Sequence, residues 1–180
     1  MKSFSEKEIF KTAQKIKLLI LDVDGVLTDG SIILDNGDNE FKSFHVRDGH
    51  GIKLLIQRGI LVALITGRDS RVVDRRAHEL GIKEVFQKSY DKRIAYKKLV
   101  KKYNLNDTEI AYIGDDIVDI PLLKICGLSV TVADADDEIK ALVMMVTKKR
   151  GGKGAVREVC DLLLKAKGFW EEIIDGYPET

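Results

Sequence analysis

The stretch LLILDVDGVLTDG, residues 18–30, decides how the rest of the chain is interpreted. A run of apolar residues leads directly into Asp22 and Asp24, and Gly25 follows. A short, continuously apolar run is typical of a parallel strand that is buried on both faces. Carboxylates at the end of such a strand are unfavourable unless they bind or react with something. The stretch therefore predicts a strand that delivers chemistry at its carboxyl end.

The rest of the chain alternates between short apolar runs and amphipathic segments. This alternation predicts an α/β fold with a doubly wound, Rossmann-like parallel sheet. The expected strands cover residues 17–23, 60–65, 84–87, 109–115, 128–132 and 142–146. The expected helices cover residues 48–58, 70–80, 91–103, 116–125, 136–142 and 155–167. Asp48 and Ser70 are the predicted N-caps of the first two helices, and Gly59 and Gly81 suit their C-terminal ends.

One segment breaks the alternation. SIILDNGDNEFKSFHV, residues 31–46, has two β-rich arms around Asn36 and Gly37, which is a strong signal for a β-hairpin. A two-stranded hairpin on its own is only marginally stable in water. We therefore expect this insert to pack on another surface, such as a second copy of itself.

Length and composition indicate one globular domain over residues 1–180, with a C-terminal helical tail over 151–180. The net charge of +1 gives no field that would attract nucleic acid or a membrane surface. No apolar run is long enough for a membrane span or a signal peptide. Cys126 and Cys160 are isolated thiols, which favours a reducing compartment, and we expect a cytoplasmic protein.

Polar residues follow four of the expected strands. Ligands of doubly wound sheets bind beyond the carboxyl ends of the strands, where Asp22, Asp24, Thr66, Lys92 and Asp115 are expected to meet. Clustered carboxylates repel one another unless a cation is present, and oxygen ligands suit Mg²⁺. Lys92 would open a helix, where its charge opposes the macrodipole, so it is expected to face an anion. The set predicts a magnesium-assisted phosphate site.

The residue types also predict a mechanism. Asp22 would attack phosphorus and form an aspartyl-phosphate, while Asp24 would protonate the leaving alcohol and later deprotonate the attacking water. Mg²⁺ and Lys92 would neutralise Asp22 so that one anion can approach another. Asp116 and Asp119 have two interpretations: Asp116 as a site acid or a helix cap, and Asp119 as a ligand or a supporting group.

Four motifs together resemble a known family. DVDGVLTDG, TGR, the helix-opening Lys92 and GDDIVD are similar, in order, to the motifs of the haloacid-dehalogenase-like phosphohydrolases. The resemblance implies Asp22 as the nucleophile, Asp24 as the acid/base, and Thr66 and Lys92 on the phosphate. It also implies a Mg²⁺ ion held by Asp22, the main-chain carbonyl of Asp24, and Asp115. The two usual insertion points hold only the hairpin and one helix with one strand, so we expect no cap domain.

Longer stretches are similar to a narrower, capless and tetrameric group of that family. FHVRDGHGIK (44–53) and GGKGAVREVCDLLL (151–164) resemble enzymes that remove phosphate from an eight-carbon sugar acid during lipopolysaccharide precursor synthesis. The resemblance implies a homotetramer with packed hairpins and a glycine-rich loop that reaches a neighbouring site. Arginine suits planar anions such as the carboxylate of a sugar acid. The implied substrate-binding residues are Asp24, His45, Val46, Arg47, Asp48, Gly49, Lys53, Arg68, Arg76 and Lys92.

Other functions remain open at this level. A nine-carbon, sialic-acid-type phosphate would use the same chemistry, and the sequence separates the two substrates poorly. A non-catalytic assembly or regulatory subunit would be expected to lack Asp22 or Asp24, and both are present. A receiver domain would carry its phosphorylated acid after the third strand, whereas this chain has no acid of that kind there.

Overall fold

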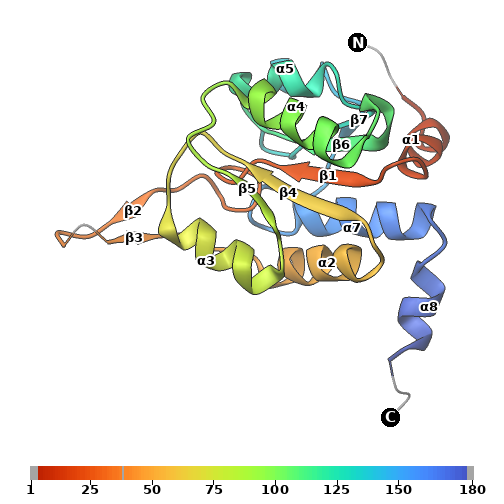
Figure 1. Cartoon of the computed structure of the whole chain (residues 1–180), viewed down its shortest axis with the longest axis horizontal. Coiled ribbons are helices and arrows are strands. Elements are labelled where there is room, and N and C mark those ends of the chain that lie inside the picture. The colour runs from red at the N-terminus through yellow and green to blue at the C-terminus, as the bar shows by residue number, and fades with distance from the viewer. Residues whose placement is uncertain (1–3, 38, 178–180) are drawn as a thin grey trace.

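The computed structural model describes residues 4–37 and 39–177 and shows a parallel sheet between two layers of helices (Figure 1). The strands of the main sheet pair in the order β5-β4-β1-β6-β7-β8, and every pair is parallel. This confirms the predicted doubly wound α/β fold. Their bounds are β1 Leu18–Leu21, β4 Leu61–Ile65, β5 Glu84–Phe86, β6 Ile110–Ile113, β7 Leu128–Thr131 and β8 Met145–Val146.

Helices cover both faces of this sheet. α2 (Val46–Gln57), α3 (Arg71–Leu80) and α7 (Ala155–Ala166) lie on one face, and α4 (Lys92–Tyr103) and α5 (Ile120–Leu123) lie on the other (Figure 1). All four residues of β1 are consequently buried, as the apolar run predicts. The other helices are α1 (Glu6–Ala13), α6 (Asp137–Lys140) and α8 (Trp170–Asp175), and 3₁₀ turns cover Asp107–Glu109 and Ile117–Asp119.

The start of α2 differs from the prediction. The helix begins at Val46 with His45 in the N-cap position, so Asp48 lies in the first turn and is not the cap. Its buried carboxylate accepts hydrogen bonds from the backbone N–H of Gly154 at 3.3 Å and of Arg157 at 2.7 Å. Burial raises the pKa of Asp48, against the effect of these bonds. Asp48 therefore joins α2 to the beginning of α7, a contact across the fold that local sequence does not encode.

Other helix ends follow the sequence more closely. Gly59 and Gly81 have φ near 77° and 78°, the left-handed conformation predicted for the ends of α2 and α3. Ser70 precedes α3 as expected, but its hydroxyl does not cap the helix and donates instead to Glu40. The helix expected over 116–125 is a 3₁₀ turn followed by the short α5. α1 was not predicted, although Ser5 and Glu8 form a capping box at its start.

The insert after β1 is a hairpin, but a shorter one than expected. β2 (Ile33–Leu34) and β3 (Glu40–Phe41) pair antiparallel and project away from the main sheet (Figure 1). The carboxylate of Asp35 accepts the backbone N–H of Gly37 and of Asn39, both at 2.8 Å, and so shapes the turn. Asp38, within the predicted hairpin, lies outside the described residues, as does the end of the predicted tail at 178–180.

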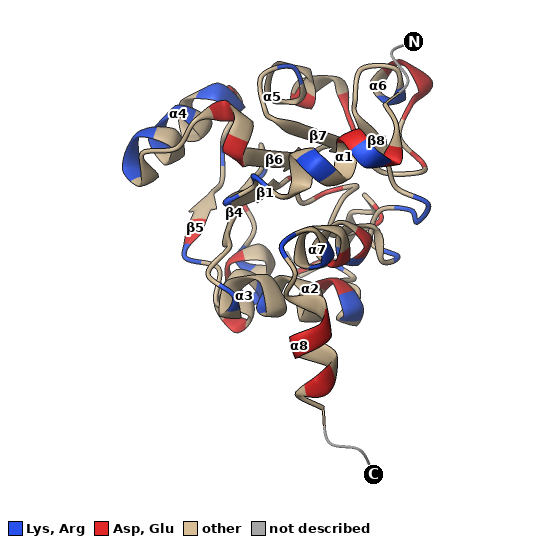
Figure 2. Ribbon diagram, turned by 90° about the vertical axis from the view of Figure 1, so that its right-hand side faces the viewer, with Lys and Arg blue, Asp and Glu red and all other residues tan. Residues whose placement is uncertain are grey.

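Within residues 4–37 and 39–177 no cap domain covers the carboxyl ends of the strands, as predicted. In these ranges the chain has only the hairpin between β1 and α2, and only α3 between β4 and β5. Lysine and arginine are frequent along α4 and acidic residues along α8, while both signs mix on other elements (Figure 2). None of the helices in the described ranges has the length and apolar character that a membrane crossing requires.

Candidate active site

A pocket of about 280 Å³ lies at the carboxyl ends of the strands around β1. Loops that follow β1, β4, β5 and β6 all contribute to its wall. Because β1 lies between β4 and β6, their loops converge at one edge of the sheet. Seven residues that the sequence singled out line it, namely Asp22, Asp24, Thr66, Arg68, Lys92, Asp115 and Asp116.

Lys92 is buried and lies between two acids. Its Nζ is 2.9 Å from Asp22 Oδ1 and 2.6 Å from Asp119 Oδ1. Asp91 caps α4 by accepting the backbone N–H of Arg93, which leaves Lys92 free to point into the site. Burial alone would lower the pKa of Lys92, but attraction by the two acids raises it. A charged amine beside Asp22 is therefore a fixed part of this pocket.

Asp119 is a residue whose role the sequence left open. Its side chain is fully buried; Oδ1 accepts the Lys92 ammonium and the Tyr112 hydroxyl, the latter at 2.5 Å. Oδ2 accepts the backbone N–H of Asp115 at 3.0 Å and of Asp116 at 3.2 Å. Four donors occupy this carboxylate, so it is a supporting group that positions Lys92 and the loop after β6.

Two of these contacts had weak signals in the sequence. Tyr112 lies in an apolar strand, and a buried tyrosine hydroxyl needs a partner. Gly114 leaves space for Asp119, because a Cβ there would collide with that carboxylate. Asp116 lines the pocket wall and also accepts the backbone N–H of Ile117 at 2.6 Å, so it caps the following 3₁₀ turn.

Asp115 is the acid with an unused oxygen. Its Oδ1 is buried and has no hydrogen-bond partner within the described part of the chain. Carboxylate oxygens of Asp22, Asp115 and Asp119 lie within 4.8 Å of one another. Burial raises the pKa of Asp22 to about 7, against the attraction of Lys92. Burial and then the charges of Asp22 and Asp119 raise the pKa of Asp115 to about 8.

These properties fit a hard divalent cation. An ion such as Mg²⁺ takes carboxylate oxygens as ligands and stabilises the ionised forms that burial disfavours. Because Asp119 is already saturated with donors, Asp22 and Asp115 are the side chains able to hold the ion. Gly25 makes this approach possible, since its φ of +90° and missing Cβ leave room for the Asp115 carboxylate.

The glycine-rich loop before α7 packs on the same part of the site. The N–H of Gly152 donates to the carbonyl of Val26 at 2.9 Å, and a Cβ at Gly151 would strike the carbonyl of Gly25. Residues 151 and 152 therefore support, within their own chain, the loop that carries Asp24.

The loop after β4 supplies a hydroxyl and a guanidinium. The Oγ1 of the buried Thr66 accepts the backbone N–H of Arg68 at 3.3 Å, so its own hydrogen remains available for donation into the pocket. Arg68 lies 3.8 Å from Asp24 Oδ2 and 3.1 Å from Glu40. Donors at these places suit an anionic group such as phosphate.

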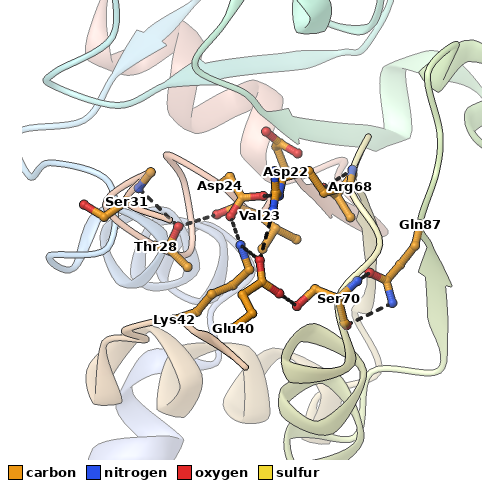
Figure 3. Close-up of polar contacts among 12 residues, drawn as sticks. Asp22, Val23, Asp24, Thr28, Ser31, Glu40, Lys42, Arg68, Ser70 and Gln87 are labelled. Atoms are coloured by element: carbon orange, nitrogen blue, oxygen red, sulfur yellow. Dashed lines mark hydrogen bonds and ion pairs between the residues drawn. The ribbon is translucent and has the colours of Figure 1, made fainter. Parts of the chain in front are cut away.

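Two hairpin residues that the sequence did not single out also reach the site. Figure 3 shows the ammonium of Lys42 between Asp24 and Glu40, and Glu40 next to Ser70. Glu40 and Lys42 are two positions apart along the arm of β3, which places them on the same side of it. This alternation was the only signal available, and it does not reveal which surface the arm meets.

The remaining predicted substrate residues lie outside the Asp22 pocket. Val46 and Arg76 line a separate surface pocket beside Phe44, and His45 and Arg47 line another of about 400 Å³ near Lys153. Gly49 packs against the Arg76 side chain, Asp48 joins α2 to α7, and Lys53 is exposed. In one copy of the chain, none of these residues lines the Asp22 pocket.

Comparisons with known proteins agree with this geometry. The family model for haloacid dehalogenase-like hydrolases matches residues 81–159. The 3-deoxy-D-manno-octulosonate 8-phosphate phosphatase of Escherichia coli K12 is 46% identical over 165 residues, which cover 92% of this chain and 88% of that protein.

Solved structures of similar proteins give the same result. The crystal structure of a phosphatase of that name from Moraxella catarrhalis, in complex with a magnesium ion, a phosphate ion and KDO, superposes with a TM-score of 0.94 at 42% identity; it covers 97% of this chain and 100% of that one. The corresponding structure from Yersinia pestis has a TM-score of 0.90 at 46% identity and covers 91% and 89% of the two chains. This chain therefore belongs to the haloacid dehalogenase-like hydrolases, within the family of 3-deoxy-D-manno-octulosonate 8-phosphate phosphatases, and is a phosphoric monoester hydrolase.

Proposed function

We propose that this protein hydrolyses 3-deoxy-D-manno-octulosonate 8-phosphate (KDO 8-phosphate) to KDO and phosphate with the help of Mg²⁺. The observation that carries the proposal is the group formed by the buried Asp22 and Lys92 and the half-buried Asp115, in which one buried carboxylate oxygen of Asp115 has no partner within the described part of the chain. The substrate is supported by the names of the relatives and by the KDO, phosphate and magnesium in the Moraxella catarrhalis complex.

The proposed reaction has two halves. Asp22 attacks phosphorus, the ester P–O bond breaks, and Asp24 gives its proton to the leaving oxygen of the sugar. A water molecule then attacks the aspartyl-phosphate, Asp24 takes its proton, and Asp22 is released with free phosphate. Lys92 and Thr66 hold the phosphoryl oxygens in this scheme. Bound Mg²⁺ supplies positive charge that offsets the repulsion between Asp22 and the phosphate.

We infer that the active form is a homotetramer. Ile33, Leu34 and Phe41 on the hairpin are each more than half exposed, which favours burial against another copy. His45, Arg47 and Arg76 lie outside the phosphate pocket of their own chain, where a neighbouring copy could use them. We place the reaction in lipopolysaccharide precursor synthesis in the cytoplasm, a setting that suits the two free cysteines.

A substrate panel tests the proposal. Values of kcat/KM are compared for KDO 8-phosphate, a nine-carbon sialic-acid-type 9-phosphate, glycerol phosphate and p-nitrophenyl phosphate, with and without Mg²⁺. We expect the eight-carbon sugar acid to exceed the simple esters by about 100-fold or more, because binding energy from the sugar is used at the reacting centre. A flat profile would refute the substrate, and a higher value for the nine-carbon ester would favour that alternative. No turnover of any ester would favour a non-catalytic subunit.

A further inference from the structure

Lys42 is an unusual lysine for an exposed hairpin arm. Its side chain is 0% exposed, although the residue as a whole is partly exposed. The ammonium contacts Asp24 Oδ1 and lies 3.4 Å from Glu40 Oε1. A buried ammonium is unfavourable unless acids pair with it, and both of its acids lie at the site. The hairpin thus places a buried cation beside the proposed acid/base.

Glu40 holds the Lys42 ammonium in its position beside Asp24. It accepts the Ser70 hydroxyl through Oε2 and the Arg68 guanidinium through Oε1, the latter at 3.1 Å. The backbone N–H of Ser70 in turn donates to the Gln87 side chain at 2.7 Å. Figure 3 shows this row of contacts from the β1 loop through the hairpin to the residues around α3. The arm of β3 is therefore tied through Glu40 to the loop after β4, although the neighbouring Phe41 is exposed.

Asp24 consequently meets two cations from two different segments. Its Oδ1 contacts Lys42, whereas its Oδ2 is 3.8 Å from Arg68 and has the looser partner. A carboxylate that transfers a proton needs one oxygen aimed at the leaving group. A firm contact on Oδ1 restricts the rotation of the carboxylate and leaves Oδ2 as the oxygen for transfer.

The geometry points to Lys42 as a positioning residue that orients Asp24 for proton transfer to the leaving alcohol. This inference rests on the proposed phosphatase function. It makes the hairpin part of the chemistry of its own chain, in addition to any contact that its exposed apolar residues make with another copy.

The test compares two kinds of ester. Glycerol phosphate has an alcohol leaving group that needs a proton, whereas p-nitrophenyl phosphate has a phenolic one that departs without it. For Lys42→Met we expect kcat on glycerol phosphate to fall about 30-fold, with KM changed less than about threefold. On p-nitrophenyl phosphate the same variant should keep kcat within about threefold of the wild type.

Three results would overturn the inference. Equal losses on both esters would indicate a structural or phosphate-binding role for Lys42. A higher KM with unchanged kcat would indicate direct contact with the substrate, and unchanged kinetics would leave Lys42 without influence. Wild-type turnover of the simple esters is enough for the comparison, so the result does not depend on the identity of the natural sugar. The substrate panel decides that question separately.

Two further variants distinguish a loss of catalysis from a folding defect. Lys42→Arg keeps the charge and should recover part of the lost kcat on glycerol phosphate. Lys102→Met removes the lysine of a surface pair with Glu84 and serves as the matched control, with no expected change on either ester. If Lys42→Met fails to fold, the leaving-group comparison is made with Lys42→Arg, where a loss confined to glycerol phosphate supports the inference and equal losses refute it.

Discussion

Two regions of the molecule differ in how their side chains are paired or covered: the acidic rim, made of Asp22, Lys92, Asp115 and Asp119, and the exposed apolar residues Leu34 and Phe41 of the β2–β3 hairpin. In the rim, Lys92 and Asp119 find charged partners from other loops of the same chain. On the hairpin, Leu34 is 66% exposed and Phe41 is 53% exposed. The ion pairs of Lys92 are thus formed within one copy of the chain, whereas one copy leaves the apolar side of the hairpin exposed.

Replacement of Asp22, at the centre of the acidic rim, should reduce activity most. Asp22→Asn should reduce phosphate release by about 10⁴-fold or more, because the amide cannot form the aspartyl-phosphate. The fold should persist, since the amide still accepts from Lys92. Asp137→Asn, at a side chain that is 97% exposed, is the matched control. Activity of the Asp22 variant above about 1% of wild type would refute this nucleophile.

The next effect concerns the proposed cation. Asp115→Asn should reduce kcat about 10³-fold and abolish the stabilisation that added Mg²⁺ gives, because its ligand oxygen is lost. Thermal midpoints with EDTA and with Mg²⁺ measure the second quantity. An equal Mg²⁺-induced shift in variant and wild type would show that the ion binds elsewhere.

The pKa of Asp115 adds a prediction about pH in metal-free buffer. Its folded-state pKa is raised by burial from 3.8 to about 8, so the folded state binds the proton more tightly than the unfolded state. The resulting stabilisation is fully present below the unfolded pKa and is lost as pH rises through the folded value. We expect the free energy of unfolding of Asp115→Asn to exceed that of the wild type by on the order of 5 kcal/mol at about pH 9 with EDTA, and by little at about pH 4. Urea unfolding at both pH values measures this difference, and a difference that stays constant with pH would contradict the linkage.

A smaller loss of activity is expected when Asp119, which contacts Lys92 and the loop after β6, is replaced. Asp119→Leu leaves Lys92 with Asp22 alone and frees two backbone N–H groups, so kcat should fall by roughly 10- to 100-fold and stability by about 3 kcal/mol. The Mg²⁺ concentration for half-maximal activity shows whether Asp119 is a supporting group or a metal ligand. In Asp119→Leu this concentration should differ from that of the wild type by less than about threefold, and a difference as large as that of Asp115→Asn would make Asp119 a ligand.

The smallest effect on the chemistry is expected at the exposed apolar residues of the hairpin. Leu34→Glu combined with Phe41→Glu should dissociate the assembly in light scattering, because charge replaces its apolar contact. We expect kcat/KM for KDO 8-phosphate to fall about tenfold and turnover of p-nitrophenyl phosphate to change less than about threefold. Ile94→Glu, on an exposed apolar residue of α4, is the control. A fully active monomer would refute the role of assembly.

The strands and seven of the residues that line the pocket could be predicted, because each depends on local pattern and on the order of the strands. Buried parallel strands are continuously apolar, and their loops meet at one edge whatever the details of packing. The position of Lys42 could not be predicted, because it depends on where the hairpin folds back, 18 residues after Asp24. The predicted start of α2 was wrong for a similar reason, since Asp48 accepts hydrogen bonds from backbone N–H groups at the beginning of α7 rather than from those of its own helix.

The packing of residues 151 and 152 on Gly25 and Val26 has a consequence for synthesis of the protein. Ribosomes make the amino-terminal part first, so the nucleophile loop emerges long before the glycines that support it. A nascent chain therefore carries Asp22 and Asp24 on an unsupported loop until residues 151 and 152 have left the ribosome and can pack beneath it.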